Sequence, residues 1–261
     1  MKISRRKFVI GLGISIVTLS VLTYSWYDRI FTDITEVNLN LGYNIRIMHI
    51  TDAHLHEWGF MEKDLAKLVS EASRDADLTV LTGDIYDSWT PHLEIIDNLF
   101  SSINSPAIAV LGNHEHWASD KYPIYDGIDR YKSFGIKVLI NEAISYRGIR
   151  IGGIDWYSDV DEIALDYLMK IGDVDILLSH TPDVIGVNPK AKIIFAGHTH
   201  GGQINIPVIG PLWTPSKYGS KYASGLFKQG ETFMYVSRGV GEAYFLPLRL
   251  NCNRELVIYS L

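Results

Sequence analysis

Short apolar runs alternate with amphipathic stretches along the chain from Asn44 onward. Residues 45–50, 78–81 and 107–111 are apolar runs of strand length, whereas residues 60–74 place apolar side chains at helical spacing. The same pattern predicts helices over 91–100 (with Pro91 in the first turn), 124–134 and 161–169, and strands over 136–140, 149–151, 175–178, 192–195, 223–227, 233–236 and 256–258. Apolar strands that alternate with helices imply a sheet covered on both faces. We therefore predict one α/β domain over residues 44–261.

Residues 1–30 differ from the rest and are predicted to form a separate segment. Positions 2–7 carry four basic residues and no acid, and the apolar run 8–26 contains one ionisable side chain, Tyr24. A basic head followed by about 20 apolar residues is typical of an export signal or a membrane helix. The pair Arg5-Arg6 resembles the twin-arginine signal, which exports folded proteins, and a plain signal anchor is the alternative. Because residues 20–27 lack a cleavage pattern, we expect an uncleaved membrane anchor with the domain on the extracytoplasmic side.

Composition and charge exclude several classes of protein. With 47% hydrophobic and 21% charged residues, the chain is globular rather than disordered, collagen-like or a coiled coil. Its single cysteine, Cys252, cannot close an intramolecular disulfide and fits a small buried residue. The net charge of -6 argues against nucleic-acid binding, so we expect no nucleic-acid surface.

Candidate metal-binding side chains directly follow five of the predicted strands. In order along the chain they are Asp52 and His54, Asp84 and Asp87, Asn113 with His114 and Glu115, His180, and finally His198 and His200. In sheets of this kind the ligand crevice lies outside the carboxyl ends of the strands, so these side chains should converge. Asp, Asn and His suit divalent ions such as Mn, Fe and Zn, and the missing cysteines argue against a thiolate zinc site.

Two of these motifs have ligand types two positions apart. A strand-like backbone would put Asp52 and His54 on one face, and likewise His198 and His200, so that each pair could bind one ion. A carboxylate such as Asp84 could bridge two ions. Two metal ions about 3.5–4 Å apart are the arrangement that hydrolyses phosphate esters.

The ordered motifs D-x-H, G-D-x-x-D, G-N-H-E, a single histidine and G-H-x-H resemble the calcineurin-like metallophosphoesterase superfamily. The longer G-H-T-H-G-G-Q and the later S-R-G-V-G and L-R-L-N-C resemble its twin-arginine-exported bacterial phosphodiesterase branch. The resemblance implies a four-layer α/β/β/α sandwich of mixed sheets flanked by helices. It also implies a metal-bridging hydroxide that attacks phosphorus in line, without a phosphoenzyme.

The resemblance assigns a role to each motif position. It implies one metal ion bound by Asp52, His54 and His200, a second bound by Asn113, His180 and His198, and Asp84 as the bridge. His114 would contact the phosphate or protonate the leaving oxygen. Asp87 would orient a ligand or water from the second shell. Glu115 stands where the superfamily usually has Asp, and its longer side chain could alter how His114 is held.

The remaining candidates have weaker signals. Asp155 follows a predicted strand and could face the site. Of the other histidines, we expect His49 in the core, His92 on a helix surface, and His56 and His116 as cleft-lining groups that do not bind metal. The apolar segment 206–222 is either a substrate-facing or membrane-facing lip, or a loop packed over the sheet edge.

We therefore predict a membrane-anchored dinuclear-metal phosphohydrolase, specifically a phosphodiesterase that uses two divalent ions (Mn, Fe or Zn). The expected substrate is a phosphodiester or pyrophosphate linked to a lipid or a nucleotide. One alternative is a pyrophosphohydrolase of a UDP-sugar lipid such as UDP-diacylglucosamine. The other is a non-catalytic envelope protein that binds metal.

Overall fold

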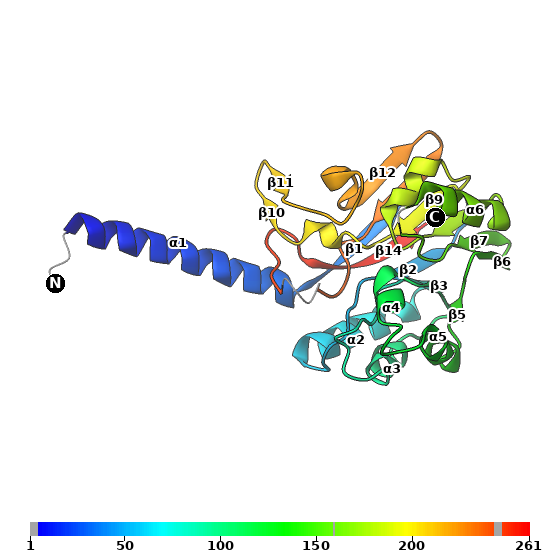
Figure 1. Cartoon of the computed structure of the whole chain (residues 1–261), viewed down its shortest axis with the longest axis horizontal. Coiled ribbons are helices and arrows are strands. Elements are labelled where there is room, and N and C mark those ends of the chain that lie inside the picture. The colour runs from blue at the N-terminus through cyan, green and yellow to red at the C-terminus, as the bar shows by residue number, and fades with distance from the viewer. Residues whose placement is uncertain (1–4, 159, 243–246) are drawn as a thin grey trace.

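Apolar strand sequences build two mixed sheets in this protein. The computed structural model describes residues 5–158, 160–242 and 247–261, without the side chains of residues 6–10, 16 and 17. Over these residues, strands form two six-stranded sheets and a two-stranded hairpin (Figure 1). The hairpin consists of β10 (Asn205–Ile206) and β11 (Gly210–Pro211).

The first sheet contains four adjacent parallel strands. Its order is β1 (Thr32–Asn38), β14 (Arg254–Ser260), β2 (Arg46–Ile50), β3 (Leu78–Thr82), β4 (Ala107–Val110) and β5 (Lys137–Val138). Strands β2 to β5 are parallel, and β14 runs antiparallel to β2 and parallel to β1. Every residue of β3 and β4 is buried, as expected for strands covered on both faces.

The second sheet is also mixed. Its order is β12 (Gly225–Gln229), β13 (Thr232–Val236), β9 (Ile193–Ala196), β8 (Ile176–Leu178), β7 (Ile149–Gly153) and β6 (Glu142–Tyr146). Strands β13, β9, β8 and β7 are parallel, and a tight turn at residues 147–148 joins the antiparallel strands β6 and β7.

Alternating side chains divide the core into layers. In β2, Ile47 belongs to the cluster between the two sheets, together with Ile176 and Phe195 of the second sheet. Met48 points the other way, toward the helices that cover the first sheet. The helices that cover the first sheet are α2 (Phe60–Arg74), α3 (Ile95–Phe100) and α5 (Ile124–Ser133). The second sheet is covered by α6 (Asp161–Ile171) and a short helix, η1 (Pro182–Val187). The predicted α/β class, with sheets flanked by helices, is confirmed.

The structure adds one strand that was not predicted and shortens one predicted helix. Strand β1 lies ahead of residue 44, yet it pairs along its whole length with β14. Helix α3 begins only at Ile95, so Pro91 and the exposed His92 lie in the preceding turn rather than on a helix. In contrast, His49 is buried as predicted, because Thr82 and Tyr259 satisfy its two ring nitrogens at 2.7 and 3.0 Å.

The N-terminal segment forms one long helix, α1 (Arg5–Ile30), which extends away from the sheets (Figure 1). Its end is joined to the domain by an ion pair between Arg29 and Glu242, with 2.8 Å between Nε and Oε2. Among the described residues, no helix has both the length and the apolar character needed to cross a membrane. Of the predicted twin-arginine segment, residues 1–4 and the side chains of residues 6–10 lie outside the described residues.

Candidate metal centre

Five of the seven predicted ligands have a left-handed backbone. The φ angles of Asp52, His54, Asp84, His198 and His200 lie between 43 and 71°. The strand-like backbone expected for the D-x-H and H-x-H motifs is therefore wrong. A non-glycine residue in this region costs of the order of 1–3 kcal/mol, which the surrounding structure has to offset. This conformation turns each loop sharply at its strand end, so the side chains gather above the sheets.

Two glycines allow the loops to approach this closely. A Cβ atom on Gly112 would lie 2.2 Å from Oδ1 of Asp84, and one on Gly197 would lie 2.2 Å from Oδ2 of Asp52. Both distances are far below van der Waals contact. A side chain at either glycine would overlap one of these carboxylates. The G-N-H-E and G-H-x-H motifs therefore need glycine at these two positions.

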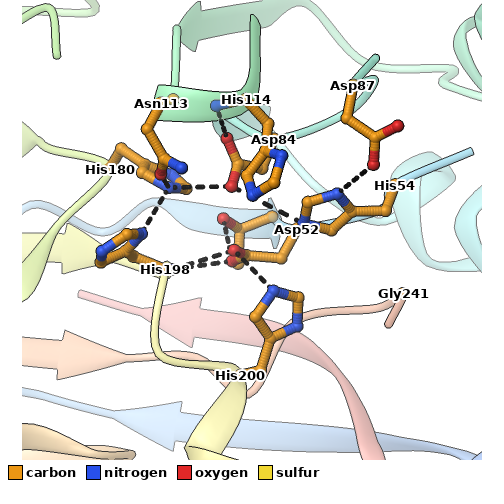
Figure 2. A network of polar contacts seen from close by, with 12 residues as sticks. Asp52, His54, Asp84, Asp87, Asn113, His114, His180, His198, His200 and Gly241 are labelled. Carbon is orange, nitrogen blue, oxygen red and sulfur yellow. Dashed lines mark hydrogen bonds and ion pairs between the residues drawn. The ribbon is translucent and has the colours of Figure 1, made fainter. Parts of the chain in front are cut away.

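The ligand atoms converge from both sheets (Figure 2). Among the described residues, three sets of side chains have ligand atoms within 4.8 Å of one another: Asp52, His54 and His200; Asp84, His180 and His198; and His54, Asp87 and His114. His198 and His200 therefore belong to different sets. The expectation that they share one ion because they point to one face is wrong.

In the set around His180, acceptor atoms face one another. The ring Nδ1 donates to the carbonyl oxygen of Thr82 at 2.6 Å, so Nε2 of the neutral ring carries a lone pair. This Nε2 lies 2.9 Å from Oδ1 of Asn113, 3.1 Å from Nδ1 of His198 and 3.2 Å from Oδ2 of Asp84. Either a proton on Nε2 or a metal ion between these atoms would relieve the repulsion among the acceptors. Burial opposes a charged His180, yet the adjacent Asp84 raises the pKa of His180 to about 10.

In the set around His54, one ring nitrogen is left without a partner. Nδ1 of His54 donates to Oδ2 of Asp87 at 2.8 Å. The buried Nε2 has no hydrogen-bond partner in the described structure, and it lies 3.6 Å from Oδ2 of Asp84. Nε2 of His200 lies 3.5 Å from Oδ1 of Asp52. A buried lone pair beside two carboxylates fits a metal ligand.

Asp84 connects the two sets through a single atom. Its Oδ2 lies 3.2 Å from Nε2 of His180 and 3.6 Å from Nε2 of His54, while its Oδ1 accepts the backbone N–H of His114 at 2.8 Å. Burial would raise the pKa of Asp84, but the nearby histidine charges hold it well below its usual range. The carboxylate is therefore ionised and oriented. The mixed nitrogen and oxygen donors suit two divalent ions without thiolate ligands.

His114 lines a cavity beside these sets. The cavity has a volume of about 140 Å³, and Trp117, Trp213 and Pro215 form much of its wall. The ring of His114 lies edge-on to His54, with 4.7 Å between ring centroids, and 4.9 Å from Trp117. Burial lowers the pKa of His114. A group bound between the two sets would therefore contact this imidazole.

Glu115 acts on the backbone rather than on the ring of His114. It lies in α4 (Asn113–Trp117), and its buried carboxylate accepts the backbone N–H groups of Asp84, Ile85 and Gly112 at 2.8, 2.7 and 2.9 Å. Burial, reinforced by the charge of Asp84, raises the pKa of Glu115 to about 7. The side chain thus joins the loops that follow β3 and β4.

Replacing Glu115 with alanine is expected to lower the free energy of unfolding by at least about 2 kcal/mol, because three buried donors lose their acceptor. Urea unfolding followed by circular dichroism measures this loss. Glu142→Ala is the control, since this half-exposed carboxylate contacts only Lys137 in the described ion pairs, and a change within about 0.5 kcal/mol is expected. Equal stability of Glu115→Ala and the native chain would contradict the role.

Asp155 lies outside the three sets. Its Oδ1 contacts Nε2 of His116 at 2.8 Å, and the neighbouring Trp156 lies against His198, with 5.4 Å between ring centroids. Trp156 and Trp117 were not predicted as site residues from the sequence. Only their positions in the sequence could have indicated a role in the site: Trp156 follows Asp155, and Trp117 lies one helical turn after His114.

This arrangement agrees with the similarity to known proteins. Residues 45–202 match the calcineurin-like phosphoesterase family. The chain belongs to this family. Membership implies a phosphoesterase hydrolase, and the clustered Asp and His side chains of this calcineurin-like phosphoesterase are suited to divalent metal ions.

Three relatives show the range of this family. The uncharacterized metallophosphoesterase YkuE of Bacillus subtilis is 31% identical over 83% of this chain and 78% of its own. The phosphodiesterase YaeI of Escherichia coli is 26% identical over 99% of both chains. The UDP-2,3-diacylglucosamine pyrophosphatase LpxG of Chlamydia trachomatis is 23% identical over 89% of this chain and 92% of its own.

Asp87 orients His54 within the calcineurin-like site. Its Oδ2 accepts from Nδ1 of His54 and, at 2.7 Å, from Nε2 of His56, while Oδ1 accepts the backbone N–H of Trp89 and Thr90. Burial would raise the pKa of Asp87, but the two histidines lower it below its ordinary value. The ionised carboxylate keeps the proton of His54 on Nδ1, so that Nε2 is free to bind metal.

Replacing Asp87 with asparagine is expected to lower kcat/KM for bis(p-nitrophenyl) phosphate by about 10–100-fold, because His54 loses its orienting acceptor. Steady-state kinetics at saturating Mn²⁺ measure the effect. His56→Gln serves as the control, since it removes the other donor to the same carboxylate oxygen and leaves His54 in place. If both variants kept native activity, Asp87 would have no orienting role.

Proposed function

We propose that the chain is a phosphodiesterase with two metal ions in the site described above. The observation that carries the proposal is the position of Asp84, whose Oδ2 faces both His54 and His180. One shared carboxylate oxygen between two histidine-containing sets is suited to two adjacent ions and a single phosphoryl group. The similarity to the phosphodiesterase YaeI over 99% of both chains supports diester hydrolysis.

Each side chain has a place in the proposed reaction. One ion would be held by Asp52, His54 and His200, the second by Asn113, His180 and His198, with Asp84 shared. When bound, the ions supply Lewis acidity toward the phosphoryl oxygens. His114 lines the cavity and would protonate the leaving oxygen. Trp117 and Trp213 line the same cavity as His114 and would contact the substrate beside its phosphoryl group.

Purified chain stripped of metal and then reloaded tests the proposal. We expect no hydrolysis of bis(p-nitrophenyl) phosphate by the stripped protein, and activity after addition of Mn²⁺, Zn²⁺ or Fe²⁺, with two bound equivalents by mass spectrometry. If reloaded protein binds metal but hydrolyses neither diesters, monoesters nor pyrophosphates, the non-catalytic metal-binding protein is the correct function.

A UDP-sugar lipid pyrophosphohydrolase is the second candidate. It is favoured by the similarity to the pyrophosphatase LpxG over 89% of this chain. Release of UMP from UDP-2,3-diacylglucosamine by the reloaded protein, at a higher kcat/KM than for simple diesters, would favour this candidate. If no UMP is released, phosphodiesterase activity remains the proposed function.

For location, we propose that residues 1–30 act as a twin-arginine signal and membrane anchor, with the domain on the extracytoplasmic side. The basic residues at positions 2–7 and the apolar run 8–26 support this proposal. Arg5→Lys combined with Arg6→Lys is expected to keep the chain in the cytoplasm, as measured by protease accessibility in spheroplasts. The single variant Lys2→Arg is the control. If export of the double variant is unchanged, residues 1–30 act as a plain signal anchor and not as a twin-arginine signal.

A further inference from the structure

The hairpin β10–β11 and the residues after it carry large apolar side chains that point into solvent. The exposed fractions are 108% for Val208, 72% for Ile209, 60% for Leu212 and 62% for Trp213. We call these four residues the apolar lip. Single exposed apolar residues are common, but four exposed within six positions of one hairpin are a concentration of the kind that marks interaction sites.

The lip is held outward by a folded hairpin. The N–H of Leu212 donates to the carbonyl oxygen of Ile204 at 3.2 Å, and a Cβ atom on Gly202 would lie 2.4 Å from Cβ of Pro211. The hairpin is thus packed on the turn that follows His200. Val208 at its tip has a φ of +71°, an unusual conformation for a β-branched residue. Local packing does not account for a strained, fully exposed valine.

The lip continues into the candidate active site. Trp213 belongs both to the lip and to the wall of the cavity that contains Asp84, His114 and His198. Trp117, itself 60% exposed, stands at the same cavity. An apolar surface therefore runs from the hairpin tip to the metal-binding side chains. A substrate that carried an apolar group next to its phosphate could lie along this surface.

The charge around the lip differs from that of the whole chain. Residues 203–230 contain three lysines and no acidic residue, whereas the chain as a whole has a net charge of -6. Lys221 is exposed, and Lys217 is paired with Asp161 of α6. Apolar side chains flanked by lysines are complementary to an anionic lipid surface, where the apolar groups insert and the cations meet headgroups.

We propose that the apolar lip docks on an anionic lipid surface, so that the site hydrolyses a phosphoester carried by a lipid. The substrate half of this inference rests on the proposed phosphodiesterase function. In Figure 1, β10 and β11 lie on the side of the domain from which α1 extends. The lip and α1 would therefore face the lipid surface from the same side of the domain.

A fluorescent probe at the tip tests docking independently of catalysis. In the full chain, Ile209→Cys labelled with a nitrobenzoxadiazole dye is added to vesicles of phosphatidylcholine and phosphatidylglycerol at about 3:1. We expect emission to rise about threefold or more and to shift to the blue. Met169→Cys is the matched control, because Met169 is 75% exposed on α6, and its emission should not change.

Three outcomes of the probe experiment would overturn docking on anionic lipid. The first is an equal response at positions 209 and 169. The second is an equal response to vesicles of phosphatidylcholine alone, since the lysines would then have no role. The third is a rise in emission with protein concentration in the absence of vesicles, which would make a second copy of the chain the occupant of the lip.

Kinetics test the substrate half of the inference. Val208→Asp combined with Ile209→Asp is expected to lower hydrolysis of vesicle-borne phosphatidyl-p-nitrophenol about tenfold, and to change hydrolysis of soluble bis(p-nitrophenyl) phosphate less than about twofold. Met169→Asp should alter neither rate. Equal losses on both substrates, or no loss on vesicles, would contradict a lipid-borne substrate. If the native chain hydrolysed neither diester, the proposed function would fail, and the probe experiment would still decide docking.

Discussion

Replacing Asp84 with asparagine is expected to lower kcat/KM for bis(p-nitrophenyl) phosphate by more than about 100-fold, beyond the usual effect of outer-sphere substitutions. Its Oδ2 is the atom that approaches both His54 and His180, and asparagine removes the negative charge while it keeps the size of the side chain. The bond from the backbone N–H of His114 to Oδ1 can persist. We also expect the bound metal to fall from two equivalents to one or none, as measured by mass spectrometry.

A matched buried carboxylate separates metal loss from loss of folding. Asp183 is fully buried in η1 and accepts the backbone N–H of Lys217 at 2.8 Å, outside the three metal-type sets found among the described residues. Asp183→Asn should reduce stability and leave the metal content of the folded protein unchanged. Two equivalents of metal and native kinetics in Asp84→Asn would contradict the shared-ligand role.

Replacing His114 with glutamine should have an effect that depends on the leaving group. A protonating residue contributes about 100–10,000-fold where the leaving oxygen needs a proton. Hydrolysis of an alkyl diester such as glycerophosphoethanolamine should therefore fall within that range. Hydrolysis of bis(p-nitrophenyl) phosphate should fall much less, because nitrophenolate leaves without protonation. Steady-state kinetics with both substrates measure the difference.

His116 provides the control for His114. It lies two positions along in α4, and its Nε2 contacts Asp155 instead of lying in the cavity wall. We expect His116→Gln to keep both activities within about threefold, as for other substitutions away from the reacting groups. An equal loss on both diesters in His114→Gln would assign His114 to phosphate binding rather than proton transfer.

The convergence of the candidate ligands could be predicted because strand order decides it. Asp52, Asp84 and Asn113 follow β2, β3 and β4, which are parallel neighbours, and the carboxyl ends of parallel strands meet at one edge. The separation of His198 from His200 could not be predicted by strand geometry. It depends on left-handed φ angles at both residues and on a tertiary contact, in which the backbone N–H of His198 donates to the carboxylate of Asp52 at 3.0 Å.

Two further features are invisible in local sequence patterns. The acceptor role of Glu115 requires that the loops after β3 and β4 lie side by side, which is a tertiary contact. The pairing of β1 with β14 joins segments more than two hundred positions apart, and the polar sequence of β1 gives no apolar run. Periodicity detects an element by its buried face, so a half-exposed edge strand escapes it.

The place of β14 in the first sheet has a consequence for how the protein is made. This strand lies between β1 and β2, so β1 cannot join the rest of the first sheet until residues 254–260 have left the ribosome. Contacts of such long sequence separation form slowly, because the loop entropy is lost before any pairing compensates for it. The first sheet therefore cannot close until β14 has been synthesised, and until then β1 and β2 each expose an unpaired strand edge, which is prone to non-native pairing.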